Sequence, residues 1–414
     1  MLDREQLRQS GRERIARIRA ALKQNELAGV VCTLPSNFLM LTGYRPVVGM
    51  SAAVASRDSG LLLIVPEDES ELAAKSWVDE VRAYQPESLD RLSGPGDAIR
   101  EPLRKALHDL KLQCADLGYE LEAASEPAYY SGVYLFQGSI VGILHDVVPS
   151  APLRPADRML SGLRAVKTAH EVECIRRACA VAGEAFARGR EQLTETHTEA
   201  EIAAYFRTGF SELGMKHEGV ERADGFAWCM SGPQAANASG AFATTGLRRV
   251  RTREPVLVHA NSYVDGYWTD ITRTYVLGEI DGSLRNVYEA VFAARAAALA
   301  EIRPGAKAAD ADRAARDVLK SRGFGDRCPH SIGHGVGFNA ISANARPRLH
   351  PKSEETLEAG MTFNVEPAIY IDGELGVRHC DMVAVTESGM ELLTPFHATL
   401  NELLVNPVMT LKAG

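Results

Sequence analysis

Apolar and polar positions alternate with two different periods along the chain, and these periods predict both helices and strands. Near the start, apolar side chains recur at helical spacing over residues 15–22, between Arg and Lys residues. Continuously apolar runs follow at 27–32 (LAGVVC) and 60–66 (GLLLIVP), and runs of this kind are typical of buried strands. We therefore predict a mixed sheet with helices for the first part of the chain.

A stretch rich in proline and small residues, VVPSAPLRPADR at 147–158, interrupts these periods. We expect it to separate two domains and place the boundary at residue 155. The chain then consists of an N-terminal domain of residues 1–155 and a C-terminal domain of residues 156–414. Both lengths are near the usual size of one domain.

In the second part, helical and strand patterns also alternate. Apolar positions three and four residues apart between Val172 and Phe186 form one stripe, which predicts a helix. Further helices are expected at 199–213, 283–302 and 308–322, and strands at 256–263, 266–277, 362–371 and 376–386. The chain as a whole is predicted to belong to the mixed α/β (α+β) class.

Composition narrows the functional classes. The 414 residues are 45% hydrophobic and 24% charged, the balance of a globular enzyme. A net charge of −8 provides no basic surface for nucleic acid, and no apolar run has the length of a membrane span. The start of the chain lacks the apolar core of a signal peptide. Seven scattered cysteines without a CxxC pair argue against a disulfide scaffold, so we expect a cytoplasmic protein with reduced thiols.

Polar residues inside the predicted strands form the first candidate site. The dipeptide Asp265-Gly266 lies between two β-rich runs and predicts a hairpin. Alternation places His259 and Asn261 on one face, and the turn brings one of them across from Asp270. Polar groups among apolar strands are costly unless they are paired or coordinate a ligand. The alternative interpretation is a solvated face of the sheet.

Two further segments add imidazole and carboxylate groups. The segment PHSIGHGVGF at 329–338 carries His330 and His334, and its glycines favour a loop or strand end over a helix. In GMTFNVEPAIY at 360–370, Glu366 precedes a proline, which favours extended backbone. An acidic residue within an apolar strand needs a partner, and a salt bridge alone would provide one.

The segment GVRHCDMVAV at 376–385 completes the candidate site. Alternation directs Arg378 and Cys380 to one side and His379 and Asp381 to the other. Taken alone, Cys380 would be interpreted as a buried apolar residue. Imidazole and thiolate suit zinc, whereas carboxylates also suit manganese or iron. A bound metal would polarise a carbonyl and generate hydroxide near neutral pH, which indicates hydrolysis of a C–N bond.

In their order and spacing, these segments resemble the pita-bread superfamily of prolidase, Xaa-Pro aminopeptidase, methionine aminopeptidase and creatinase. The resemblance is also carried by SNFLMLTGY at 36–44, LRAVKTAHEVECIRRA at 163–178, MSGPQ at 230–234, GYWTDITRTY at 266–275 and RPGAKAADAD at 303–312. It implies a creatinase/prolidase-like N-terminal α/β domain, a pita-bread catalytic domain with internal pseudo-symmetry, and a homodimer.

The resemblance also implies a metal site, from which this chain departs. Dimetal members use two Asp, one His and two Glu as ligands, and Asp270, His334 and Glu366 occupy three of those positions. His259 and Cys380 replace one Asp and one Glu. Because an imidazole nitrogen cannot bridge two ions as a carboxylate does, we expect all five residues to hold one divalent ion. Zinc is favoured over manganese or iron. A rearranged site and decay of the site are the other interpretations.

Three functions are compatible with these residues. The first is metal-dependent hydrolysis of a peptide or amide C–N bond, with Glu366 handling the proton of water and His330 and Arg378 positioning the substrate. The second is metal-free C–N hydrolysis of the creatinase or ectoine-hydrolase type, in which His330, Glu366 and His379 perform acid–base chemistry.

The third function is that of a binding module without activity. Ser239 and Ile341 support it, because they occupy positions where Xaa-Pro peptidases carry catalytic histidines. We favour the first function because Asp270 and Glu366 are kept. The expected partner is a small molecule or short peptide, with neither nucleic acid nor membrane involved.

Overall fold

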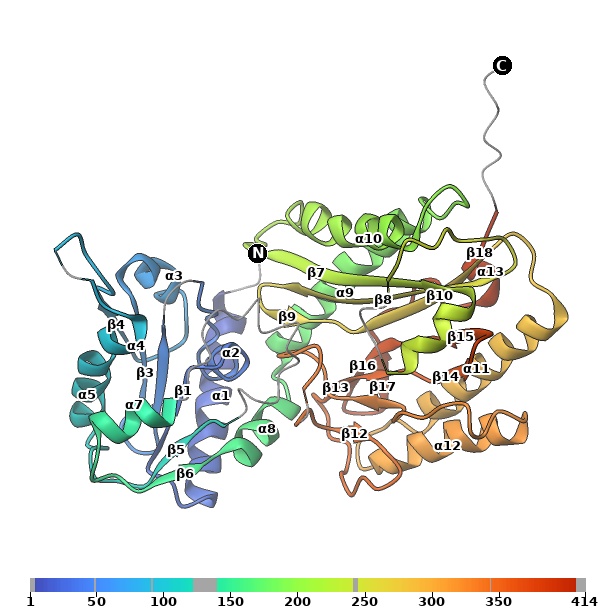
Figure 1. Ribbon diagram of the computed structural model, residues 1–414. Helices are drawn as coiled ribbons and strands as arrows, with labels where there is room; N and C mark the ends of the chain where they lie inside the picture. Colours follow the sequence, from blue (N-terminus) through green and yellow to red (C-terminus); the bar gives the residue numbers. More distant parts are fainter. Residues whose placement is uncertain are drawn as a thin grey trace. The chain divides into compact units, whose positions relative to one another are not determined.

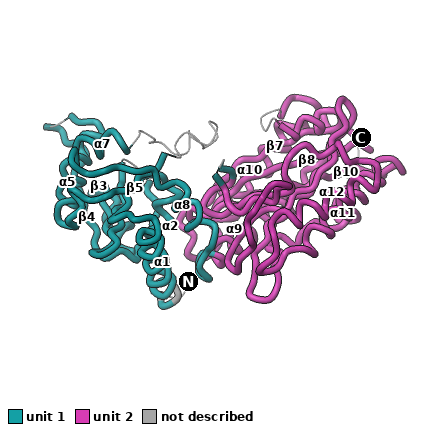
Figure 2. Tube along the Cα trace, turned by 90° about the horizontal axis from the view of Figure 1, so that it is seen from below, with its two compact units in different colours: residues 1–171, 341–344 teal, residues 172–340, 345–414 magenta. Residues whose placement is uncertain are grey.

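The computed structural model describes residues 4–47, 50–90, 92–121, 140–240, 245–342 and 344–406. The chain forms two compact units, shown in Figure 2. Unit 1 comprises residues 1–171 and 341–344, and unit 2 comprises residues 172–340 and 345–414. The boundary expected at residue 155 falls inside unit 1 and stays a prediction. No helix in the described ranges is long and apolar enough to cross a membrane.

Unit 1 is built on a six-stranded mixed sheet in the order β4-β3-β2-β1-β5-β6. Its strands are β1 (Gly29–Cys32), β2 (Ala52–Ser56), β3 (Leu61–Pro66), β4 (Glu80–Tyr84), β5 (Leu117–Tyr119) and β6 (Leu153–Pro155). Its helices are α1 (Arg4–Gln24), α2 (Pro35–Thr42), α3 (Ser70–Ala73), α4 (Pro95–Ala98), α5 (Arg100–Asp109), α7 (Ile140–Val147) and α8 (Asp157–Ala165), with the 3₁₀ turn η1 (Glu67–Glu69). β1 pairs antiparallel with β2 and parallel with β5, which confirms the predicted mixed sheet, and the residues of β1 and β3 are buried throughout, as their apolar runs predicted.

The first half of unit 2 consists of two helices followed by strands. They are α9 (Ala169–Arg190), α10 (Glu199–Gly214), β7 (Ala223–Ser231), the 3₁₀ helix η3 (Gly232–Ser239), β8 (Pro255–Val264), β9 (Tyr267–Trp268) and β10 (Ile271–Leu277). The sheet order is β18-β10-β8-β7, with β9 paired to β8 and β18 (Leu404–Val405) at the edge. Figure 1 shows α10 lying over β7 and β8, which makes β8 a central, covered strand.

The second half repeats this order of helices and strands. Its elements are α11 (Gly282–Ala300), α12 (Ala308–Ser321), β11 (Gly333–His334), β12 (Arg348–Leu349), β13 (Thr362–Val365), β14 (Ala368–Ile371), β15 (Leu375–Arg378), β16 (Asp381–Val385), β17 (Met390–Leu392) and α13 (Leu400–Leu403). β13, β16 and β17 form one sheet, while β14 pairs with β15 and β11 with β12. The two similar halves give unit 2 the expected pita-bread architecture.

Three strands that the sequence predicted as continuous are interrupted in unit 2. The interruptions separate β9 from β10, β13 from β14 and β15 from β16, and they fall at Asp270, Glu366 and Cys380. The prediction of continuous strands over 266–277, 362–371 and 376–386 was therefore wrong at these points. The released backbone groups pair with other segments, since the Glu366 amide donates to the carbonyl of Ile332 at 2.7 Å and the Cys380 amide to that of Thr272 at 3.1 Å. These pairings bring distant segments of unit 2 together.

Candidate active site

The hairpin predicted from Asp265-Gly266 is present and positions the first two site residues. Both turn residues have positive φ, 49° and 91°, the conformation that Asp-Gly adopts readily in a two-residue hairpin. β8 pairs antiparallel with β10, and His259 lies opposite Thr272. Asp270 follows β9 and directly precedes β10, so its side chain starts at the break between these strands.

Asp270 is the centre of the cluster, and its two carboxylate oxygens face different neighbours. Oδ2 lies 3.4 Å from Nε2 of His334 and accepts a hydrogen bond of 3.2 Å from Nδ2 of Asn364. Oδ1 lies 3.7 Å from Nδ1 of His259 and 3.7 Å from Sγ of Cys380. Burial raises the pKa of Asp270. The hydrogen bond to His334 and the charges of His259 and His334 outweigh burial, so the pKa lies below its ordinary value.

His334 connects Asp270 with Glu366. Its Nε2 lies 3.8 Å from Oε1 of Glu366. Its Nδ1 lies 3.2 Å from the carbonyl oxygen of Gly335, which can only accept, so Nδ1 carries a hydrogen and the neutral ring offers its lone pair at Nε2. Burial lowers the pKa of His334, but the hydrogen bond and charge of Asp270 and the charge of Glu366 outweigh it and raise the pKa.

His259 and Cys380 lie on the Oδ1 side and are both buried. The Cys380 thiol donates to the main-chain carbonyl of Asp270 at 3.1 Å. Burial and the nearby charges of Asp270 and Glu366 raise the pKa of Cys380 well above its ordinary value. The His259 ring stacks on Trp228, with 5.4 Å between ring centres. Burial and the charge of Arg378 lower the pKa of His259 to about 3.

A chain of hydrogen-bonding groups connects His330 with the cluster. Nε2 of His330 lies 3.1 Å from the hydroxyl of Tyr370, to which Nη1 of Arg378 donates at 3.3 Å. Nε of Arg378 donates at 3.0 Å to the hydroxyl of Thr272, and that hydroxyl lies 3.0 Å from Nδ1 of His259. Burial lowers the pKa of His330, which favours the neutral ring. The predicted positions of His330 and Arg378 thus share one polar network.

Two residues of this network were missed in the sequence. Asn364 accepts a hydrogen bond of 2.7 Å from the amide of His334 and directs its own nitrogen to both His334 and Asp270, at 3.2 Å each. Tyr370 joins His330 to Arg378. Alternation along an extended segment was the available signal, since these residues precede and follow Glu366 by two and four positions.

Three other residues were considered in the sequence, namely His379, Ser239 and Ile341. His379 lies on the opposite side of the break between β15 and β16, with Nε2 3.4 Å from Asp381 and its ring 5.0 Å from that of Phe292. Burial lowers the pKa of His379 to about 4. Ser239 is exposed at the end of η3 and follows Ala238, whose carbonyl accepts from Nη1 of Arg378 at 3.3 Å, and Ile341 belongs to unit 1. His379 therefore does not join His330 and Glu366.

The donor atoms of the cluster are engaged with one another. Among the described residues, no group of three or more His, Cys, Asp or Glu side chains could hold a metal ion as the side chains stand. Asn364 occupies lone pairs of Asp270 and His334. The chemistry on the Oδ2 side still fits a divalent ion, because Nε2 of His334 lies 3.4 and 3.8 Å from oxygens of Asp270 and Glu366. Ligands about 2.1 Å from a tetrahedral ion lie about 3.4 Å apart.

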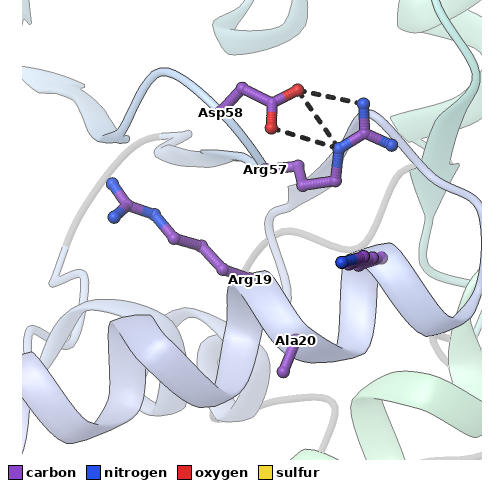
Figure 3. A pocket seen from close by; sticks show the side chains of 5 residues that line it. Arg19, Ala20, Arg57 and Asp58 are labelled. Atoms are coloured by element: carbon purple, nitrogen blue, oxygen red, sulfur yellow. Dashed lines mark hydrogen bonds and ion pairs between the residues drawn. The ribbon is translucent and has the colours of Figure 1, made fainter.

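Figure 3 shows a separate pocket of about 410 Å³ in unit 1. It is lined by Arg19, Ala20, Lys23, Arg57 and Asp58. The Arg57 guanidinium and the Asp58 carboxylate pair with each other, with Nη2 donating to Oδ2 at 2.9 Å. The pocket contains none of the candidate site residues, and its charges are partly compensated.

Fold and donor set together define a hydrolase of the pita-bread class. The Metallopeptidase family M24 matches residues 173–387, more than half of the chain, and the Creatinase/Prolidase N-terminal domain matches residues 14–133. The chain therefore belongs to metallopeptidase family M24. This confirms the resemblance, the fold class and the assignment as a hydrolase of the Xaa-Pro metallopeptidase type.

Individual relatives agree with this membership. The chain is 28% identical to the Xaa-Pro dipeptidase of Pyrococcus furiosus, over 92% of this chain and 98% of that protein. The structure is similar to the prolidase from Pyrococcus horikoshii OT3, with a TM-score of 0.74, 26% identity, and 92% and 98% of the two chains covered. It is also similar to the Xaa-Pro dipeptidase from Bacillus anthracis, with a TM-score of 0.77, 25% identity, and 95% and 100% covered.

Proposed function

We propose that this protein is a metal-dependent hydrolase that cleaves a C–N bond in a short peptide or related amide. The observation that supports this most is the convergence of Asp270, His334 and Glu366 from three separate segments, with Nε2 of His334 within 3.8 Å of both carboxylates. These three residues would hold the ion, and His259 and Cys380, 3.7 Å from the other oxygen of Asp270, are the further proposed ligands. When bound there, a divalent ion polarises the scissile carbonyl and lowers the pKa of a water molecule.

The protein's own residues would hold the proton and the substrate. Glu366, a residue that is 8% exposed, would accept the proton of the attacking water with its carboxylate. Arg378 is fixed by Thr272 and Tyr370, and within the described residues its Nη2 is buried without a hydrogen-bond partner. That N–H group is suited to a carbonyl or carboxylate of the substrate. His330, held by Tyr370, would orient the other side of the scissile bond.

The Xaa-Pro dipeptidases that resemble this chain make short peptides with a proline the first substrates to test. An imidazole with two carboxylates suits zinc, and manganese or iron are the alternatives. We also propose a homodimer in the cytoplasm, as expected from the sequence. Neither of these properties affects the argument for the metal site.

The test uses full-length protein purified without chelator, with metal content and hydrolysis of a panel of Xaa-Pro dipeptides and simple amides measured together. We expect bound transition metal, activity that chelation removes, and activity that zinc or manganese restores. Glu366→Gln should abolish turnover while the fold remains. Glu358→Gln, which changes an exposed glutamate of the same unit, is the matched control and should retain turnover.

Two results would favour the other functions. Full activity after prolonged chelation would indicate metal-free hydrolysis, although His379, which that mechanism requires, lies with Asp381 instead. Failure of the whole peptide and amide panel in metal-replete protein would favour a binding module.

A further inference from the structure

His330 lies in a short segment without regular secondary structure. Residues 328–332 are all described, and they lie between α12 and β11 without belonging to a helix or strand. Pro329 within this segment has no amide hydrogen to donate. Buried main-chain groups outside helices and sheets need partners from side chains, other backbone or water. The position of His330 therefore depends on the groups that bind this segment.

Arg316 of α12 binds two carbonyl groups of the segment. Its Nη1 donates to the carbonyl oxygen of Cys328 at 3.0 Å, and its Nη2 donates to that of His330 at 2.6 Å. A guanidinium is planar and presents its N–H groups in a fixed geometry, so these two contacts set the positions of both carbonyls together. The segment is thus attached to α12 on both sides of Pro329.

Asp312, one turn earlier on α12, completes the attachment. Its Oδ2 accepts from Nε of Arg316 at 2.7 Å, and its Oδ1 accepts from the amide of Ile332 at 3.1 Å. The Asp312 side chain is fully buried, and a buried carboxylate is stable only when it is paired and hydrogen-bonded, as it is here. Asp312 is the last residue of the motif at 303–312, and the candidate site contains no residue of that motif.

The same segment also contacts the strand break that carries Glu366. The carbonyl oxygen of Ile332 accepts from the Glu366 amide at 2.7 Å. The His330 ring lies with Nδ1 2.8 Å from the carbonyl oxygen of Ser331 and with Nε2 3.1 Å from the hydroxyl of Tyr370. A shift of this backbone would therefore change the position of the His330 ring relative to both Glu366 and Tyr370.

We propose that Asp312 and Arg316 are positioning residues for the reaction, because they fix residues 328–332 and thereby hold His330 in its place relative to Glu366 and Tyr370. Neither residue is expected to contact the substrate. This inference rests on the proposed function, in which His330 and Glu366 act at the scissile bond. It gives the ion pair on α12 an effect on turnover that passes through His330.

The test combines Arg316→Lys with His330→Ala in the full-length protein and measures kcat and KM on a hydrolysed dipeptide. Arg316→Lys keeps a charge beside Asp312 but loses the planar fork that binds both carbonyls. We expect kcat/KM to fall about tenfold, since a small misplacement of a group at the reacting centre is costly. In the His330→Ala background the same substitution should have no further effect, because the two residues act as one unit. A purely structural loss would multiply with that of His330→Ala instead.

Hydrogen exchange measured by mass spectrometry adds a readout that does not depend on turnover. In Arg316→Lys, amide protection should fall in peptides covering residues 328–334 and be kept in the rest of unit 2. Elemental analysis should show an unchanged metal content. Arg316→Met, which removes every donor, is tested in the same way and should show the larger losses. Arg313→Lys, at a largely exposed arginine of the same helix, is the matched control and should leave kinetics and exchange unchanged.

The outcomes distinguish the two proposals. Unchanged exchange or unchanged kinetics in both Arg316 variants, losses that multiply in the double variant, or loss of the metal from folded Arg316→Lys would each overturn this inference and leave the proposed function standing. An unmodified, metal-replete protein without activity would overturn the proposed function and the inference with it. A local loss of protection together with a loss of kcat/KM that disappears in the His330→Ala background supports both.

Discussion

Two buried aspartates of unit 2, Asp270 and Asp381, differ in the groups that surround them. Asp381 accepts from Nη2 of Arg273 at 2.8 Å and from the hydroxyl of Thr394 at 2.9 Å, and it also pairs with Arg295. Burial raises the pKa of Asp381, but the charge of Arg273 and its other cationic neighbours lower it far below its ordinary value. Asp381 is thus neutralised by permanent cations at hydrogen-bonding distance.

Asp270 is equally buried, yet its neighbours at 3.2 to 3.7 Å are imidazole, amide and thiol groups, and Arg378 acts on it through its charge. These groups can bind a metal or change protonation state, whereas a guanidinium does neither. The comparison teaches that burial of a carboxylate does not by itself indicate a functional site. What separates the two aspartates is whether a fixed cation pairs with the carboxylate at hydrogen-bonding distance.

The largest expected effect concerns activity. Asp270→Asn removes the charge that the ion requires, and a loss of about 4 kcal/mol of transition-state stabilisation lowers kcat/KM about 1,000-fold. Stability should change less than at Asp381, because Arg378 acts on Asp270 through its charge, whereas Asp381 is hydrogen-bonded directly to Arg273 and Arg295. Peptide hydrolysis, metal content and thermal unfolding of the variant measure this. A variant with strongly reduced thermal stability but nearly unchanged turnover in its folded fraction would contradict the comparison.

The reverse is expected at the second aspartate. Asp381→Asn leaves Arg273 and Arg295 buried without their carboxylate and should cost about 3–5 kcal/mol of unfolding free energy. Denaturant unfolding monitored by circular dichroism measures it. Asp310→Asn is the control, because its ion pair with Arg313 is largely exposed and contributes at most about 1 kcal/mol. Equal losses in the two variants would show that burial of the Asp381 pair has no importance for stability.

The sequence predicts which side chains share a face and where the hairpin turns, but it does not predict the long-range backbone pairings at the strand breaks. Alternation correctly places Arg378 and Cys380 on one side and His379 and Asp381 on the other, and the Asp-Gly turn correctly predicts the hairpin. Pro367, which has no amide hydrogen for a ladder, was a local signal for the break at Glu366, whereas the break at Cys380 had no such signal. Their backbone groups pair with Ile332 and Thr272, which are distant along the chain, and local periodicity contains no information on such partners.

The role of each aspartate was hidden for the same reason. In the sequence, Asp381 directly follows the candidate ligand Cys380, and Asp270 lies between Thr269 and Ile271. Neither context shows which side chains surround the carboxylate in the folded protein. The cations that distinguish them, Arg273 and Arg295, come from β10 and α11. Only the tertiary structure shows that they reach one aspartate.

A smaller effect is expected within the network beside Asp270. Tyr370→Phe removes the hydroxyl that joins His330 to Arg378, so both side chains lose one contact that orients them. We expect kcat/KM to fall about tenfold, equivalent to about 1.4 kcal/mol. Steady-state kinetics on a hydrolysed dipeptide measure it. Tyr205→Phe, a change at an exposed tyrosine of α10, should leave both kinetic constants unchanged. If Tyr370→Phe has the same kinetic constants as Tyr205→Phe, the Tyr370 hydroxyl has no role in orienting His330 and Arg378 for catalysis.

In unit 1, two buried cations, Arg14 and Lys167, also differ in the groups that surround them. Arg14 is fully buried and paired with Glu171, which is also fully buried. Lys167 is 4% exposed and donates to the carbonyl of Ala165 at 3.2 Å. Burial lowers the pKa of Lys167 to about 7; the charge of Glu171 opposes this shift, and Arg14 and Arg164 reinforce it. The charges that act on Lys167 thus oppose one another, and burial determines the direction of its shift.

The smallest expected effect follows from this pKa. A lysine in the unfolded chain has a pKa of about 10.4, so between about pH 7 and about pH 10 the unfolded state binds more protons than the folded state. Stability must then rise with pH in this range and fall on acidification toward the folded pKa. From about pH 8 to about pH 7, Lys167 should reduce the free energy of unfolding by about 1 kcal/mol. Denaturant unfolding at both pH values measures the change.

Lys167→Met should remove this contribution to the pH dependence and raise stability near neutral pH, because a buried charge is replaced by an apolar side chain of similar length. The control is Lys23→Met, in which the lysine is exposed on α1 and should leave the slope as it is. If both variants keep the slope of the unmodified protein, Lys167 does not change its protonation in this range. The dependence of a buried group's protonation state on a close, fixed counter-charge, seen for the two aspartates, would then hold for anions only. If only Lys167→Met loses the slope, compensation by a close, fixed counter-charge decides the state of buried groups in both units.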